Sequence, residues 1–217
     1  MLSRDEYLKQ PLKERFMKLS KNEEDRANGL QEKLISIDLH SHLASANRVG
    51  EFVREKVRNS GVTCFFEAIG IVDEVYEESV SELGRIFHFI QSQPDMVLGF
   101  KAEDIRKAKK EGRQLMMAQL EPQSIGLQLN RIDTLYGLGV RMMMLTFNTR
   151  NYVGEGCAER TDGGLSYFGI DVVNKMNEIG MMIDLSHCGD KTTLDTIEAS
   201  KDPVLFNHTG ARSVNPK

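Results

Sequence analysis

Hydrophobic and polar positions follow two different patterns along this chain. Residues 3–33 are dense in charged side chains and hold few apolar ones, which predicts surface helices interrupted near Pro11. From Leu34 onward, short apolar runs bounded by turn residues recur, as is typical of strands buried on both faces. The predicted strands cover residues 34–38, 62–69, 96–100, 114–120, 140–147, 181–185 and 203–207.

Helical patterns separate most of these strands. Residues 101–112 indicate a helix with a solvated basic face, and residues 166–180 carry apolar side chains at helical spacing. Asp190 is expected to cap a short helix over 190–199 whose buried side carries Leu194 and Ile197. Alternation of strands and helices predicts right-handed βαβ units and a parallel sheet.

Composition adds several limits to this picture. The chain has 217 residues, 40% of them hydrophobic and 28% charged, which excludes a low-complexity or disulfide-stapled protein. A formal net charge of −4 argues against nucleic-acid binding. No apolar run approaches the ~20 residues needed to cross a bilayer. The first thirty residues hold no apolar signal segment, so we expect a cytoplasmic protein if Met1 is the true start.

Most of the histidines follow predicted strands, together with one glutamate. These candidate ligands are His40, His42, Glu121, His187 and His208. In a parallel barrel, the carboxyl ends of the strands line one common mouth, and the two side chains of H-x-H share a face. Imidazole and carboxylate suit zinc, and a carboxylate can bridge two ions. The pattern therefore predicts a metal site, whereas His88, inside a helical stretch, is expected to be structural.

The motifs of the second half are also those of a known family. The blocks ERTDGGL, MNEIGMMIDLSH and FNHTGARS strongly resemble the membrane (renal) dipeptidase family of metallopeptidases, and the resemblance runs from about Leu34 to the end. That family is a (β/α)8 barrel with a binuclear zinc centre that hydrolyses dipeptides. The resemblance implies a barrel domain at 34–217, after a helical extension at 1–33, and two divalent ions, expected to be zinc.

Four family ligands match positions of this chain in the expected order. His40 stands at the histidine of the family's H-x-D motif, and Glu121 matches the glutamate that bridges the metals. His187 and His208 are 21 positions apart (208 − 187), like the two histidines that hold the second metal.

The chain departs from the family at other positions. His42 replaces the family's aspartate and leaves the metal pair one charge more positive, and Pro122-Gln123-Ser124 replace the usual Gly-Gly-His after the glutamate. Phe147 stands where some members have a substrate-contacting histidine, so we expect Phe147 or the adjacent Asn148 to line the substrate site. Asp184 is expected to support a ligand through a hydrogen bond, with a core or capping role as the alternative.

Length conflicts with the implied fold. The chain holds about six of eight barrel strands, and the family's substrate-binding arginine and proton-shuttling aspartate are expected beyond Lys217. We therefore expect a fragment of a longer protein that is inactive by itself.

The predicted function is metal-dependent hydrolysis of a dipeptide by a metal-activated water, in a protein that could form homodimers like its family. Two alternatives stay open. One is another barrel amidohydrolase acting on a cyclic amide, lactone or phosphoester, which His42 fits better than the dipeptidase pattern does. The other is a descendant that binds a ligand without catalysis.

Overall fold

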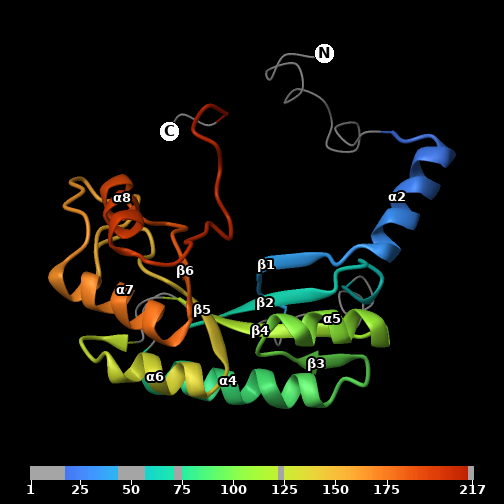
Figure 1. Ribbon diagram of the computed structural model, residues 1–217, viewed down its shortest axis with the longest axis horizontal. Helices are drawn as coiled ribbons and strands as arrows, with labels where there is room; N and C mark the ends of the chain where they lie inside the picture. Colours follow the sequence, from blue (N-terminus) through green and yellow to red (C-terminus); the bar gives the residue numbers. More distant parts are fainter. Residues whose placement is uncertain (1–17, 44–56, 71–74, 122–124, 215–217) are drawn as a thin grey trace. The chain divides into compact units, whose positions relative to one another are not determined.

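A computed structural model describes residues 18–43, 57–70, 75–121 and 125–214 (Figure 1). The chain divides into two compact units, Met1–Leu34 and Ile35–Lys217. The predicted helix before Pro11 lies outside the described residues. None of the described helices is both long and apolar enough to cross a membrane.

The first unit contains helix α2 (Lys21–Lys33), which has no buried residue. The helix begins with a capping box: the Glu23 carboxylate accepts a hydrogen bond from the Ser20 amide at 2.7 Å, and the Ser20 hydroxyl accepts one from the Glu23 amide. Its polar surface agrees with the predicted surface helix.

The second unit is built on a parallel sheet. Its strands are β1 (Ile37–Ser41), β2 (Cys64–Ile69), β3 (Met96–Leu98), β4 (Gln114–Leu120), β5 (Val140–Met144) and β6 (Met182–Asp184). Their order is β1-β2-β4-β5-β6, and the short β3 pairs with the beginning of β4. All the pairs are parallel, which confirms an α/β fold with part of a barrel sheet (Figure 1).

Helices follow each strand from β2 onward. They are α4 (Tyr76–Gln91), α5 (Ala102–Glu111), α6 (Asn130–Gly137), α7 (Tyr167–Ile179) and α8 (Asp190–Ala199). Gly112 and Gly180 end α5 and α7 with φ of 65° and 75°, a left-handed conformation that glycine adopts without a Cβ clash. These two helices lie where the sequence pattern predicted them.

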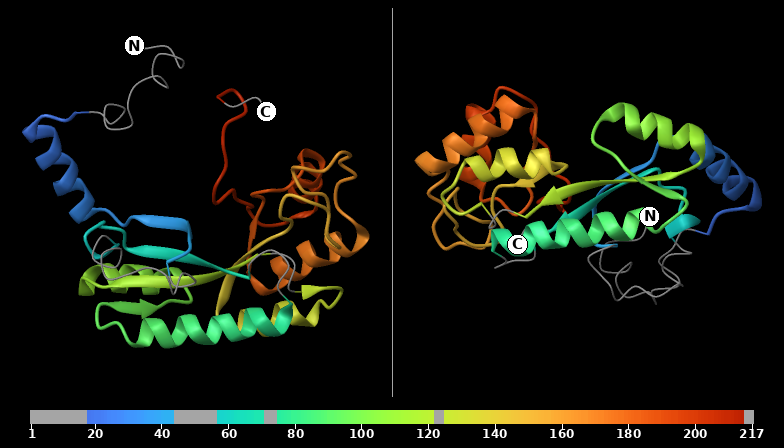
Figure 2. Two further views of the ribbon diagram at one scale, coloured as in Figure 1. Left: turned by 180° about the vertical axis from the view of Figure 1, so that it is seen from behind. Right: turned by 90° about the horizontal axis from the view of Figure 1, so that it is seen from below.

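The two faces of the sheet carry separate hydrophobic clusters. One face packs side chains of β2, β4, β5 and β6 against α4, α6 and α7, whereas the other packs Phe66, Met117 and Met142 against Ile105 and Ala108 of α5. The view from below in Figure 2 shows α4 and α5 on opposite sides of the sheet. Burial of both faces explains why the strands read as continuous apolar runs.

Strand β4 keeps its predicted bounds, whereas β2, β3, β5 and β6 are shorter than predicted by two or three residues. The first and the last predicted strands differ in other ways. β1 begins at Ile37 instead of residue 34 and extends through Ser41, so that His40 lies inside the strand. Its register with β2 shifts between Asp38 and Ser41, which marks a bulge beside this histidine. The predicted strand at 203–207 forms only one bridge, between Leu205 and Asp184. Its far side has no partner strand among the described residues.

The prediction for α8 is wrong in two respects. Gly189 is the N-cap, and Asp190 is the first helical residue. The Asp190 carboxylate instead pairs with the Arg212 guanidinium at 2.8 Å, so this side chain is turned away from the helix end.

The predicted buried side of α8 is also wrong. Leu194 and Ile197 are 65% and 52% exposed, and the buried side carries Thr192 and Thr196. The Thr192 hydroxyl accepts a hydrogen bond from the Glu155 amide at 3.0 Å.

Candidate metal centre

The predicted ligands gather at the carboxyl ends of the barrel strands. His40 lies near the end of β1, Glu121 directly follows β4, and His187 follows β6. His208 follows the bridge at Leu205. The rings of His40 and His208 are 4.1 Å apart, centroid to centroid, so the structure joins residues that are far apart in sequence.

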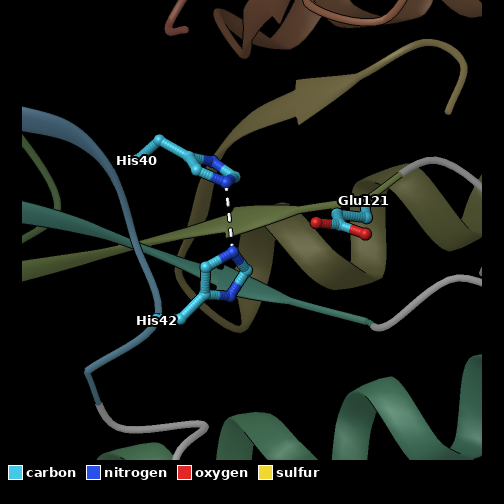
Figure 3. Close-up of side chains that lie close together, drawn as sticks. All are labelled: His40, His42 and Glu121. Carbon is cyan, nitrogen blue, oxygen red and sulfur yellow. Dashed lines mark hydrogen bonds between the residues drawn. The ribbon is translucent and has the colours of Figure 1, made fainter. Parts of the chain in front are cut away.

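His40, His42 and Glu121 form one group of donors. One ligand atom from each lies within 4.8 Å of the other two. The two Nε2 atoms are 3.1 Å apart, and Figure 3 shows the imidazoles pointing toward each other with the Glu121 carboxylate beside them. Glu121 is 8% exposed, whereas His42 is open to solvent. The predicted change in the loop at residues 122–124 lies outside the described residues.

His187 and His208 form the second group. Their Nε2 atoms are 2.8 Å apart. The Nδ1 atom of His187 is 2.8 Å from the Asn148 side-chain oxygen, and the Nδ1 atom of His208 contacts the side-chain oxygen of Asn207. Each of these Nδ1 atoms therefore lies against a side-chain amide that can fix the tautomer of its ring.

This arrangement fits a bound cation. With protons on both Nδ1 atoms, the two Nε2 lone pairs of His187 and His208 face each other, and a cation between them removes the repulsion. Two nitrogens that share a tetrahedral zinc ion at about 2.0–2.1 Å lie about 3.3–3.4 Å apart. The observed separations of 2.8 Å here and 3.1 Å between His40 and His42 are shorter than that value by a few tenths of an ångström, so each pair would open slightly around a cation.

The electrostatics of the site favour neutral imidazoles. Burial, followed by the neighbouring His208, His42 and His187, lowers the pKa of His40 to about 4. Burial and His208 also lower the pKa of His187, partly offset by Asp184. Neutral imidazole is the form that binds a divalent metal, so these residues are suited to that role at neutral pH.

The structure places both residues predicted as substrate contacts against His187. The Phe147 ring stacks on the imidazole with centroids 4.3 Å apart, and Asn148 contacts its Nδ1. These contacts orient the histidine. A direct contact with substrate stays a prediction.

Asp184 holds the backbone beside two of the histidines. Its Oδ1 accepts hydrogen bonds from the amides of Ser186 and Asn207, the residues directly before His187 and His208. Its Oδ2 is buried and has no hydrogen-bond partner within the described ranges. The carboxylate thus supports the backbone before both histidines, and its role beside a metal stays a prediction.

Sequence analysis missed three polar side chains of this region. Gln119 contacts Nδ1 of His40, and its Oε1 accepts a hydrogen bond from the Asn207 side chain at 2.8 Å. Glu67, in β2, accepts hydrogen bonds from residues on both sides of His42. Gln119 and Glu67 are polar residues inside apolar strands, and that interruption was the signal that could have identified them.

The family model described as membrane dipeptidase (peptidase family M19) matches residues 23–217. Dipeptidase 3 of Rattus norvegicus is 42% identical over 97 residues, which cover 42% of this chain and 20% of that protein. An uncharacterized dipeptidase of Schizosaccharomyces pombe is 38% identical over 94 residues, which cover 38% of this chain and 23% of that protein.

Solved structures share the fold. An amidohydrolase from Pseudomonas aeruginosa is 30% identical with a TM-score of 0.81, and the match covers 88% of this chain and 57% of that one. A metallopeptidase from Rhodobacter sphaeroides, solved with a phosphinate mimic of L-Ala-D-Ala, is 19% identical with a TM-score of 0.71, covering 84% and 67%. The chain thus spans about a fifth of the curated relatives' length and just over half of the amidohydrolase.

Proposed function

Because the chain belongs to the membrane dipeptidase family, peptidase family M19, we propose that it forms the metal-binding part of a metal-dependent dipeptidase. The observation that carries this proposal is the pair of converging Nε2–Nε2 contacts, His40 with His42 and His187 with His208, at the carboxyl ends of one parallel sheet.

The proposed centre holds two zinc ions. His40 and His42 would bind one ion, His187 and His208 the other, and Glu121 has two oxygens with which to bridge them. When bound, the ions lower the pKa of a shared water toward neutrality and polarise the scissile carbonyl.

The protein's own groups keep these donors in place. Asn148 and Phe147 fix the ring of His187 from its edge and its face, so that Nε2 points toward His208. The low exposure of Glu121 keeps water from competing for its oxygens. Donors that are ordered before the metal arrives lose less conformational entropy on binding.

The substrate class rests on the family. Dipeptides are the proposed substrates, and L-Ala-D-Ala is a sensible member of a test panel because a fold relative was solved with its phosphinate mimic. His42, which stands in place of an acidic ligand, is the one observation that favours another amidohydrolase reaction, so the panel also needs a cyclic amide and a lactone.

The test uses the full-length protein loaded with zinc. We expect hydrolysis of dipeptides such as L-Ala-L-Ala or L-Ala-D-Ala, loss of activity after chelation, and two metal equivalents by mass spectrometry. His187→Ala should lose metal and activity, whereas the matched control His88→Ala, an exposed histidine of α4, should keep both. Failure of the metal-replete protein to cleave any dipeptide would refute the proposal. Turnover of only the cyclic amide or the lactone would instead identify the protein as another amidohydrolase.

A further inference from the structure

One loop holds His187 from two sides. The Asn148 side chain lies 2.8 Å from Nδ1 of the imidazole. The Cys157 amide donates a hydrogen bond of 2.8 Å to the His187 carbonyl oxygen. The loop is closed between these two contacts, because the Ala158 amide donates to the Asn148 carbonyl oxygen at 2.8 Å. The orientation of this candidate ligand therefore depends on how closely the two sides of the loop pack together.

Gly156 is the point of closest approach between the two sides. A Cβ atom at this position would overlap the Asn148 carbonyl group and lie 2.5 Å from the Thr149 amide nitrogen, whereas real Cβ atoms keep at least 3.0 Å from such atoms. The φ of Gly156 lies outside the left-handed region, so space alone requires glycine here. An added methyl group must therefore move one side of the loop by 0.5 Å or more (3.0 − 2.5).

The side of the loop that carries Gly156 is anchored. The preceding Glu155 amide donates to the Thr192 hydroxyl of α8 at 3.0 Å, and Gly156 itself forms a bridge with Cys188, the residue after the ligand. The Asn148 side is therefore the one that moves when a methyl group is added. Its 2.8 Å contact with the imidazole does not keep its geometry through such a shift.

Arg150 keeps the two sides together. Its guanidinium donates to both carboxylate oxygens of Glu155, at 2.7 and 2.9 Å, and its amide donates to the Glu159 side chain at 2.9 Å. The Glu155 side chain is 9% exposed and that of Arg150 is 61% exposed, so loss of the arginine leaves a buried carboxylate without its partner. Because Arg150 lies two residues after Asn148, this ion pair draws the Asn148 side onto Gly156.

We propose that Gly156 and Arg150 are positioning residues, which set the contact between Asn148 and His187 without touching the metal. Gly156 permits the close packing of the loop, and Arg150 enforces it. The inference rests on the proposed function, in which His187 binds a zinc ion. Disturbing a group that orients a metal ligand costs about 10- to 100-fold in affinity, so both residues should affect zinc binding by that factor.

Zinc titration of the full-length protein against a chelator tests the role of Gly156. Gly156→Ala should weaken the binding of one zinc equivalent about 10- to 100-fold. Gly84→Ala is the matched control and should not change zinc affinity, because this glycine is exposed on α4 and its Cβ would meet no atom within 4 Å. Cobalt(II), bound in place of zinc, should show a changed visible spectrum in Gly156→Ala alone. Wild-type affinity and spectrum in Gly156→Ala would overturn the inference.

A double variant separates positioning from general disruption. Asn148→Ala already lacks the side chain that orients His187, so adding Gly156→Ala should weaken zinc binding no further. If the two losses add instead, Gly156 does not act through Asn148 and the inference fails.

Arg150 variants test the same contact without a steric clash. Arg150→Ala should weaken zinc binding about 10- to 100-fold, and Arg150→Lys should recover part of the loss, because lysine keeps the charge but not the paired hydrogen bonds. The control Arg58→Ala breaks an ion pair of 2.6 Å with Asp95, which directly precedes β3, and should lower stability in urea without changing zinc affinity. If Arg58→Ala weakens zinc binding as much as Arg150→Ala does, the loss reflects general destabilisation and the inference fails.

These measurements are independent of turnover. Unchanged zinc affinity in Gly156→Ala and Arg150→Ala, in a protein that cleaves dipeptides, would overturn this inference alone. The expected losses of zinc affinity, in a protein that cleaves no dipeptide, would refute the proposed function alone.

Discussion

Glu67 is expected to hold the turn that carries His42, and its replacement by glutamine tests this directly. Glu67 lies in β2 opposite Ser41 and has no exposed surface. Its Oε2 accepts a hydrogen bond from the Ser41 hydroxyl at 2.8 Å and another from the Leu43 amide at 2.8 Å. These two donors flank His42, so the carboxylate fixes the backbone on both sides of this ligand.

The size of the effect follows from these two bonds. A hydrogen bond to a charged group contributes about 1.5–3 kcal/mol, and one to a neutral group about 0.5–1.5 kcal/mol. The oxygen of an introduced glutamine can stay between the same donors, so Glu67→Gln keeps both bonds, makes their acceptor neutral and places an NH2 group where the carboxylate has Oε1. The difference over two bonds is about 2–3 kcal/mol of unfolding free energy. Ser41→Ala removes one of the two hydrogen bonds to the charged group and should cost about 1.5–3 kcal/mol.

Urea unfolding of the full-length protein, followed by circular dichroism, measures these differences. Glu198→Gln is the matched control, because this glutamate is exposed on α8 and its substitution should change the unfolding free energy by less than about 0.5 kcal/mol. The double variant Ser41→Ala/Glu67→Gln should show that the two effects are not additive, since both break the same contact. If Glu67→Gln changes the unfolding free energy no more than the Glu198→Gln control does, the reasoning is refuted.

Three further expectations concern single side chains. The exposed Cys157 should react with iodoacetamide at pH 8. Burial raises the pKa of Cys64 to about 12, so roughly one Cys64 thiol in ten thousand is ionised at this pH and Cys64 should stay unlabelled. Peptide mass spectrometry measures the labelling of each cysteine, and equal labelling would contradict the burial of Cys64. Gly180→Ala, at φ 75°, should lower the unfolding free energy by about 1–2 kcal/mol, and a neutral result in thermal melts would show that the helix end relaxes. Asn148→Ala should weaken zinc binding about 10- to 100-fold in chelator competition, because His187 loses the partner of its Nδ1; unchanged affinity would exclude that role.

Local signals were sufficient for the positions of α5, α7 and α8 and for the middle of most strands. Helix α7 lies at Tyr167–Ile179, within the predicted 166–180, because Ser166 and Gly180 cap it through contacts only a few residues away. The start of β1 could not be predicted in the same way. Leu34 is apolar but exposed and outside the strand, since the ladder with β2 begins only at Ile37.

The site shows the same division between local and distant information. His187 and His208 could be located because each follows an apolar run whose end is visible in the sequence. The hydrogen bond between the side-chain amides of Gln119 and Asn207 joins residues 88 positions apart, and no local pattern of either segment encodes it. The prediction that Leu194 is buried was wrong for a similar reason. The buried side of α8 contacts Glu155, which is 37 positions away from Thr192 in the sequence.

The backbone conformation of two residues in the candidate metal centre has a consequence for how this protein can evolve. Asn148 and His187 are the non-glycine residues with positive φ in the described part of the chain, at 52° and 63°, and they contact each other. An L-residue pays about 1–2 kcal/mol for such a conformation, and glycine avoids this penalty. Selection for heat resistance alone would therefore be expected to place glycine at both positions. Laboratory evolution under selection for stability alone should therefore replace these two side chains early, whereas selection that includes metal binding should keep them.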